Sequence, residues 1–215
     1  MPAPQFTVIN TFTLKNPQDA DAFERRFLDH VRWMRRQEGF RAHQAVRATE
    51  TPEVYVNFGW WGRPEDFQQV LATETFQAHA KEFHQVVDVE ADPSLGVVRV
   101  DGPEAGEPSL VVIERFTVGG AQEIGAGSAF EDAYRAYAQA AAGVDGFVHC
   151  DLAKALKRPG GYTAAIAWRD EQGRKTAEAT PEYAALIALA TPQVLTATPV
   201  AGNRAAALTG VADRA

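Results

Sequence analysis

The sequence predicts an α+β protein built from two tandem copies of one β-α-β-β-α-β unit. Two observations predict it. Landmark residues recur at a constant spacing, and the hydrophobic pattern between them runs twice through the same order of strands and helices. An internal repeat of this kind decides the fold class before any single element does. In a chain of 215 residues, each copy has the size of a small domain of roughly 100 residues.

The repeat is visible in landmarks that align without gaps. Gly39 and Gly146 are 107 positions apart, and the same offset relates Thr73 to Thr180. Upstream, Val-Ile-Asn-Thr-Phe-Thr at 8–13 matches Val-Ile-Glu-Arg-Phe-Thr from 112 at an offset of 104, so the second copy has three extra residues before or within its first helix. We interpret the chain as a duplication. The aromatic landmarks at the offset of 107 are Phe40 and Phe147, Tyr55 and Tyr162, Trp61 and Trp168, and Phe76 and Tyr183.

The first copy opens with a strand and a helix. Residues 6–14 alternate between two faces, which is the period of a strand. Asn16 followed by Pro17 predicts an N-cap and a first helical position. The helix expected over 17–37 has an apolar stripe, and Gly39 is well placed to end it. One strand face carries Phe6, Val8, Asn10, Phe12 and Leu14, and the helix stripe carries Phe23, Phe27, Val31 and Met34.

A hairpin, a broken helix and a last strand complete the first copy. Two strands over 40–48 and 53–61 are joined by a Thr-Glu-Thr-Pro turn, which predicts an antiparallel pair. Pro64 opens a second helix that we expect to break near Thr73 and restart, and a last strand is expected over 95–100. The order is that of the split βαβ, or ferredoxin-like, arrangement.

The second copy repeats this order. A ferredoxin-like sheet covers one face with helices and leaves the other needing a cover, so we expect the two sheets to close a barrel of the dimeric α+β type within one chain. The expected domain plan is 1–102, a linker at 103–108 rich in Pro, Gly and acid, a second domain at 109–202, and a flexible tail at 203–215. The elements expected in the second copy are strand 109–118, helix 127–143, strands 147–155 and 161–169, helix 174–190 and strand 193–200.

Composition and charge narrow the function classes. The formal net charge of -7 argues against nucleic acid or an anionic membrane as the main partner. The single cysteine, Cys150, cannot form an internal disulfide or a multi-cysteine metal site. The N-terminus lacks the pattern of a signal peptide, and no apolar run is long enough to span a bilayer. We therefore expect a cytoplasmic protein.

The two copies differ in polar residues on apolar strand faces. Asn57 and Trp61 lie four residues apart, so their side chains share one face of a strand. The second copy keeps the tryptophan but has Ala164 in place of Asn57, and it has Glu114 in place of Asn10. The asparagines are either satisfied core amides or lining groups of a cavity that donate to a ligand carbonyl or phenolate. The asymmetry favours an active site in the first copy alone.

Aromatic and histidine residues suggest the rest of such a site. His79 falls near the apolar stripe of the second helix, which makes it the preferred proton acceptor, whereas His84 lies on another face. His30 is a weaker candidate, and His43 reads as an ordinary strand residue. The histidines lack metal-ligand spacing, so no metal site is expected. The residues expected to hold an aromatic substrate are Trp33, Phe27, Tyr55, Phe67 and Phe76.

The first copy resembles a known family. Val-Tyr-Val-Asn-Phe-Gly-Trp-Trp at 54–61, followed by Phe67 and by Glu-Thr-Phe-Gln-Ala-His at 74–79, is similar to the antibiotic biosynthesis monooxygenase superfamily of dimeric α+β barrels. The resemblance covers the first copy and, more weakly, the second. The Asn-x-x-x-Trp spacing and Asn10 are similar to its polyketide oxygenases. Haem-degrading members fit less well, since their helical tryptophan falls near Val70 and the histidine register is off by one at His79.

The resemblance implies an oxygenase of aromatic polyketide biosynthesis, with Asn57, Trp61, Asn10 and His79 as catalytic residues. It implies oxidation or opening of a ring of a polycyclic phenol by O2, as in angucycline or anthrone chemistry. It also implies no tightly bound cofactor, but reduced flavin (FADH2 or FMNH2) as a cosubstrate from a separate reductase. A cofactor-independent quinone-forming monooxygenase stays open, as do a non-oxidative polyketide-binding or cyclase barrel and a homodimer of tandem chains.

Overall fold

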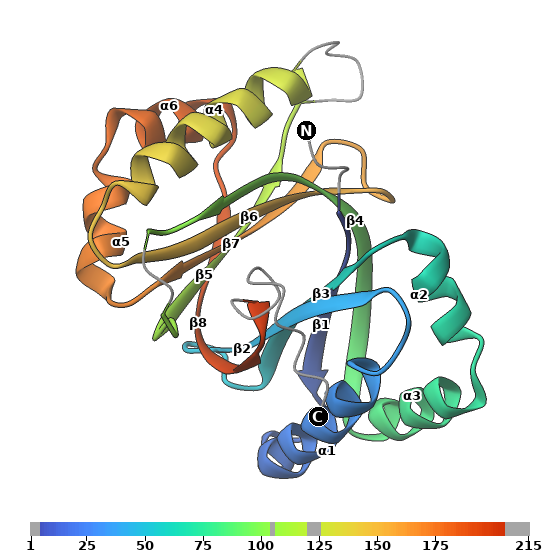
Figure 1. Ribbon diagram of the computed structural model, residues 1–215. Helices are drawn as coiled ribbons and strands as arrows, with labels where there is room; N and C mark the ends of the chain where they lie inside the picture. The colour runs from blue at the N-terminus through green and yellow to red at the C-terminus, as the bar shows by residue number, and fades with distance from the viewer. Residues whose placement is uncertain (1–4, 104–105, 120–125, 205–215) are drawn as a thin grey trace. The chain divides into compact units, whose positions relative to one another are not determined.

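A computed structural model describes residues 5–103, 106–119 and 126–204. The expected order of elements is confirmed in both copies (Figure 1). The first copy comprises β1 (Phe6–Leu14), a 3-10 turn (Pro17–Asp19), α1 (Ala20–Met34), β2 (Phe40–Ala48), β3 (Val54–Trp61), α2 (Pro64–Leu71), α3 (Glu74–Val86) and β4 (Val87–Asp101). The second comprises β5 (Leu110–Thr117), α4 (Ala126–Ala142), β6 (Phe147–Ala155), β7 (Gly161–Trp168), α5 (Glu171–Glu178), α6 (Pro181–Leu189) and β8 (Gln193–Gly202).

The predicted caps and turns account for the boundaries in the first copy. The Asn16 side chain accepts a hydrogen bond from the backbone N–H of Gln18 at 3.1 Å and caps the 3-10 turn that leads into α1. The Thr73 hydroxyl accepts one from the N–H of Phe76, so the expected break falls between α2 and α3. α1 ends at Met34 rather than at residue 37, and Gly39 adopts φ +77°, a left-handed conformation that favours glycine.

The largest departures from the expected boundaries are in β4, the last helical segment and β8. β4 begins at Val87 rather than at 95, because Val87 and Val89 pack inward while Asp88 and Glu90 face solvent. The helix expected over 174–190 is two helices, α5 and α6, since Thr180 caps a new start at Pro181. β8 runs to Gly202 rather than to 200, and Asn203 beyond it pairs with the backbone of β2. Residues 205–215 of the expected tail lie outside the described residues.

The strands are connected in the hydrogen-bonded order β1-β3-β2-β8-β5-β7-β6-β4, which is that of a closed barrel, as expected. The chain separates into two compact units, Met1–Pro93 with Pro199–Ala215, and Ser94–Thr198. We call these the first and second units. The long strands β4 and β8 each begin in one unit and end in the other, so the compact units and the sequence repeat divide the chain differently.

In the first unit, α1 and α3 pack against one face of the β1-β3-β2 sheet (Figure 1). The register pairs Asn10 with Asn57 across β1 and β3, and His43 with Gly59 across β2 and β3. Aromatic rings fill the layer between helices and sheet, as in the pair Phe23 and Tyr55, whose ring centroids are 4.8 Å apart. This layer contains the candidate site.

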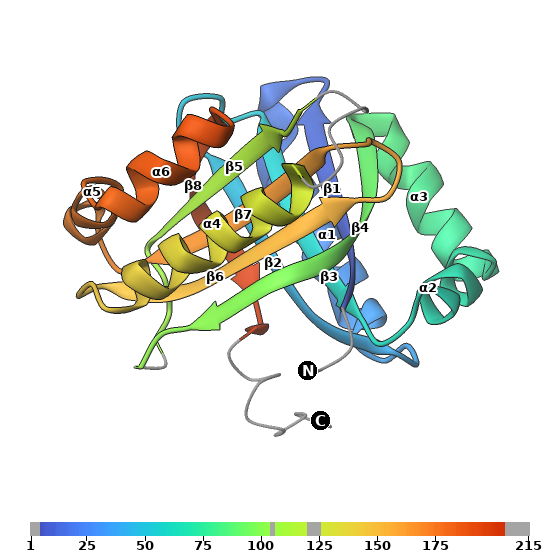
Figure 2. The same cartoon turned by 90° about the horizontal axis from the view of Figure 1, so that it is seen from above.

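In the second unit, α4 lies across β6 and β7 (Figure 2). Its helix-to-sheet layer is a continuous apolar core in which Phe130, Tyr134, Ile166 and Leu186 are almost completely buried. The two copies thus share one architecture but fill the equivalent layer differently.

Candidate active site in the first unit

Two amides face the helices from the middle of the first unit's sheet. Asn57 is half-buried within a strand whose neighbouring residues are buried, and Asn10 lies opposite it on β1. Cβ atoms of such opposed residues lie roughly 4.5–5.5 Å apart. The Oδ1 atom of Asn57 is buried and has no hydrogen-bond partner. Because an unpaired buried polar atom costs about 1–3 kcal/mol, this amide is arranged for a ligand better than for stability.

Gly59 leaves its buried position on β3 without a side chain, next to two N–H donors. A Cβ placed on Gly59 would lie 3.6 Å from the indole Nε1 of Trp61, 3.7 Å from the backbone carbonyl oxygen of Val8 and 3.9 Å from Nδ2 of Asn57. Both donors therefore border the space above this glycine. An oxygen atom held there could accept from the amide and the indole together, which is the arrangement that stabilises negative charge developing on oxygen.

His43 lies beside these donors, opposite Gly59 on β2. Its side chain is 4% exposed and its Nδ1 atom has no hydrogen-bond partner. Burial, and to a smaller extent the nearby Arg35 guanidinium, lower the pKa of His43 to about 4, although an interaction with the Asn57 side chain acts in the opposite direction. The imidazole is consequently neutral at pH 7.

A small cavity adjoins Asn57 beneath α1. It measures about 10 Å³, which is room for roughly one water molecule. Phe12, Phe23 and Phe27 form much of its wall, and Ala45 leaves the space on β2 open. A polycyclic ligand therefore requires the helix layer to move away from the sheet.

A second group of predicted residues lines a surface groove of about 540 Å³ between α1 and α3. His30 and His79 meet there with their Nδ1 atoms 3.0 Å apart, and Trp33 lies 5.2 Å from the His79 ring. Burial, and to a smaller extent His79, lowers the pKa of His30 to about 4. Phe83 lies in the wall of this groove and also packs on Phe12 at 6.2 Å, so it lies between the groove and the apolar layer.

The remaining predicted residues lie either at the groove, against Trp61 or in the buried aromatic layer. Phe76 packs on His30 at the groove, with ring centroids 5.9 Å apart, and Phe67 packs on Trp61 at 5.2 Å. Phe27 is buried in the aromatic layer. The Tyr55 hydroxyl donates to Glu24 at 2.7 Å, and burial and this carboxylate raise the pKa of the phenol.

The second copy repeats this tyrosine contact. There the Tyr162 hydroxyl donates to Glu131 at 2.8 Å, with Lys154 above its ring. Because both copies keep the same arrangement, the tyrosine–glutamate pair belongs to the shared scaffold. The predicted residues thus fall into three groups. Asn10, Asn57 and Trp61 lie on the sheet, with Phe67 of α2 packed on Trp61. Trp33, Phe76 and His79 lie at the groove, and Phe27 and Tyr55 are buried in the aromatic layer.

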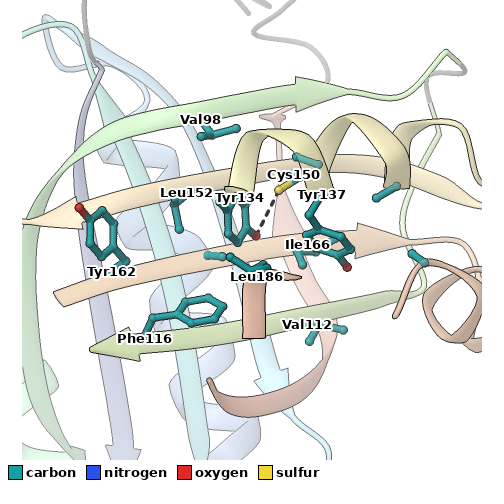
Figure 3. Close-up of a cluster of buried hydrophobic side chains, with 14 of the residues drawn as sticks. Val98, Val112, Phe116, Tyr134, Tyr137, Cys150, Leu152, Tyr162, Ile166 and Leu186 are labelled. Carbon is teal, nitrogen blue, oxygen red and sulfur yellow. Dashed lines mark hydrogen bonds between the residues drawn. The ribbon is translucent and has the colours of Figure 1, made fainter. Parts of the chain in front are cut away.

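The equivalent site in the second unit is filled. At the offset of 107, larger apolar residues replace Gly59 and Ala45, and Cys150 replaces His43 (Figure 3). The Cys150 sulfur is 3.4 Å from the Tyr134 hydroxyl, so both polar groups are paired. The replacements are Ile166 for Gly59, Leu152 for Ala45, Ala164 for Asn57, Tyr134 for Phe27 and Leu186 for His79.

A carboxyl group is buried in the second unit at the position equivalent to Asn10. Glu114, which stands in place of Asn10, is 1% exposed and accepts a hydrogen bond from the Tyr183 hydroxyl at 3.0 Å. Burial raises its pKa to about 7, although the hydrogen bond opposes this. Its Oε2 atom is buried and has no hydrogen-bond partner, but the neighbouring positions on the sheet carry the apolar side chains of the second unit's core.

No group of three or more His, Cys, Asp or Glu side chains in the described part of the chain could hold a metal ion. No described helix is long and apolar enough to cross a membrane.

The sequence matches the profile of the antibiotic biosynthesis monooxygenase (ABM) family twice, over residues 5–82 and 110–189. The chain therefore belongs to this family and is an oxygenase with two ABM domains in one polypeptide. No curated protein matches it by sequence.

Solved structures share the fold. A candidate monooxygenase from Lactobacillus acidophilus NCFM superposes with a TM-score of 0.74 at 12% identity, over 93% of this chain and 95% of that chain. An anthrone oxidase-like protein superposes with 0.65 at 16% identity, over 93% and 92%. SnoaB, a cofactor-independent oxygenase from Streptomyces nogalater, is 26% identical over 42% of this chain and 91% of its own, with a TM-score of 0.39.

Proposed function

We propose that this oxygenase oxidises, or oxidatively opens, a ring of a polycyclic phenol of the aromatic polyketide class. The reaction takes place in the first unit, and the second is a structural half. The observation that carries the proposal is that Gly59 lies without a side chain next to the N–H donors of Asn57 and Trp61, whereas the second unit has Ile166 at the equivalent position. Membership of the ABM family supports the reaction class.

The site chemistry suits a phenol. Loss of a proton makes the ring system electron-rich enough to react with O2, and the negative charge settles on the ring oxygen. In this proposal the Asn57 amide and the Trp61 indole donate to that oxygen, where fixed donors contribute most to lowering the barrier, and their position next to Gly59 supports this role. His79, in the groove with His30, is the proposed proton acceptor, and Asn10 orients the substrate beside Asn57.

The source of electrons distinguishes two reactions. In quinone formation, a ring CH2 group gives up four electrons and two protons to O2, one oxygen atom enters as a carbonyl, and the other leaves with the two protons as water, so no other reductant is needed. In ring opening, one oxygen atom is inserted into a carbon–carbon bond and the other leaves as water, which requires two further electrons and two protons. Reduced flavin from a separate cytoplasmic reductase would supply these. We favour ring opening of the angucycline type.

Reduced flavin fits the groove better than the cavity. The space beside Asn57 is about 10 Å³, whereas the groove between α1 and α3 is about 540 Å³, within the range of ligand sites. Trp33 and His30 provide flat surfaces in its wall, and Arg25 and Arg26 provide positive charge. Flavin would act there as a cosubstrate that exchanges with solvent.

Oxygen uptake with an angucyclinone or an anthrone tests the proposal. Purified protein should consume O2 with the aromatic only when a flavin reductase, flavin and a nicotinamide are present, after subtraction of uptake by the reductase system alone. Uptake without flavin would instead support cofactor-independent quinone formation. Absence of uptake under both conditions, with tight binding of the same aromatics, would contradict the oxidation and leave a binding or cyclising role.

A further inference from the structure

His43 is a buried imidazole to which the proposed reaction gives no role. Its ring is enclosed, its Nδ1 atom has no partner, and it faces the same layer as Asn57. In the second unit the equivalent Cys150 is paired with Tyr134 and needs no ligand. An unpaired polar atom at this depth lowers stability unless something binds to it.

The backbone holds His43 firmly in place. Its N–H donates to Oδ1 of Asn203 at 2.8 Å, and its carbonyl accepts from the N–H of Asn203 at 3.0 Å. The Phe40 ring, which packs edge-on against Trp61 at 5.1 Å, also lies 6.4 Å from the imidazole. The side chain is therefore fixed relative to the two donors that border Gly59.

The protonation state decides what this imidazole can do. With a pKa of about 4 it is neutral at pH 7, so one ring nitrogen carries a hydrogen and the other offers a lone pair. Removal of a proton from a phenol, whose pKa is about 10, is strongly unfavourable for so weak a base. Acceptance of a hydrogen bond from the hydroxyl has no such cost.

We propose that His43 is a substrate-recognising residue whose imidazole accepts a hydrogen bond from a phenolic hydroxyl, while Asn57 Nδ2 and Trp61 Nε1 donate to a second oxygen on the same edge of the ring system. This inference rests on the proposed function and narrows it. The substrate class is a polycyclic aromatic that carries a free hydroxyl beside another ring oxygen. An analogue with that hydroxyl methylated leaves the imidazole unpaired and binds more weakly.

Equilibrium binding of a hydroxylated anthraquinone and of its O-methyl ether tests this inference. Both probes are already quinones, so binding is measured without turnover, by quenching of tryptophan fluorescence. Wild type should prefer the free phenol by about tenfold, the value of one net hydrogen bond. The His43→Leu variant should bind the two probes equally, and His43→Gln, which keeps an acceptor oxygen, should retain part of the preference.

The design separates this inference from the proposed function. A preference for the phenol that persists in a folded His43→Leu protein would overturn it, and so would equal binding by wild type. Cys150→Ala, the matched change in the second unit, should leave the preference intact, and loss of the preference in that variant would also count against it. Failure of oxygen uptake alone would contradict the oxidation but not the recognition of the hydroxyl.

Discussion

Replacement of Asn57 by alanine should lower turnover of a polycyclic phenol by about 10²–10³-fold, the usual effect of removing one donor to a developing oxyanion. Nδ2 of Asn57 and Nε1 of Trp61 are the two donors among the three atoms nearest to a Cβ at Gly59, so loss of the amide leaves the indole alone. Since the charge develops during the reaction, the loss should appear mainly in kcat.

The same substitution should leave the fold intact. Oδ1 of Asn57 has no hydrogen-bond partner, and the second copy has alanine at this position within the same strand. We therefore expect a Tm within a few degrees of wild type. Full turnover by a folded Asn57→Ala protein would contradict a role for the Asn57 amide in the reaction. Oxygen uptake at saturating aromatic, together with a thermal melt, measures both quantities.

The substitution Gly59→Ala, which adds a methyl group next to the two donors, should also lower turnover. The added Cβ of Gly59→Ala would make only ordinary contacts, the nearest being Trp61 Nε1 at 3.6 Å, so the protein should fold. The methyl group nevertheless enters the space between the two donors. Displacement of a substrate by about 1 Å costs on the order of 10²-fold in rate, and we expect at least that loss.

Gly106→Ala is the matched control for this change. A Cβ at Gly106 meets nothing within 4 Å, so both stability and turnover should match wild type. If Gly59→Ala turned over at the wild-type rate, the substrate oxygen could not lie above Gly59, and the two donors would have to act elsewhere. Steady-state oxygen uptake distinguishes these outcomes.

Most of the fold could be predicted because the sequence contains two copies of the same β-α-β-β-α-β unit. The offset of 107 fixed equivalent strands and helices, and the turn and cap residues Asn16, Thr73 and Gly39 act locally. The start of β4 was missed although Val87 and Val89 alternate with acidic residues, because the preceding helix shares its apolar stripe. β4 and β8 each contribute residues to both compact units, and this depends on long-range contacts that no local sequence pattern encodes.

The site was predicted less completely, because the strands and the turn were predicted without a cross-strand register, and His43 was taken as an ordinary strand residue. In the structure His43 pairs with Gly59, so its side chain lies on the face of Asn57. A slip of one residue exchanges the two faces of a strand. The sequence signal that points to the site is the pair of substitutions Gly59 to Ile166 and Asn57 to Ala164 between copies.

The location of the active site in the first copy alone is tested most directly by one measurement on two matched variants, Trp61→Phe and Trp168→Phe. Both tryptophans are buried, and each packs edge-on against a phenylalanine, Phe40 at 5.1 Å and Phe147 at 5.4 Å. The two changes should thus lower Tm by similar amounts, as each removes one indole from an equivalent core position.

Oxygen uptake by these two variants with the aromatic substrate and reduced flavin, measured side by side, should differ by about a hundredfold. Trp61→Phe should lose turnover because the indole donor beside Gly59 is gone, and Trp168→Phe should keep the wild-type rate. Equal rates in the two proteins, or a loss confined to Trp168→Phe, would contradict an active site in the first copy.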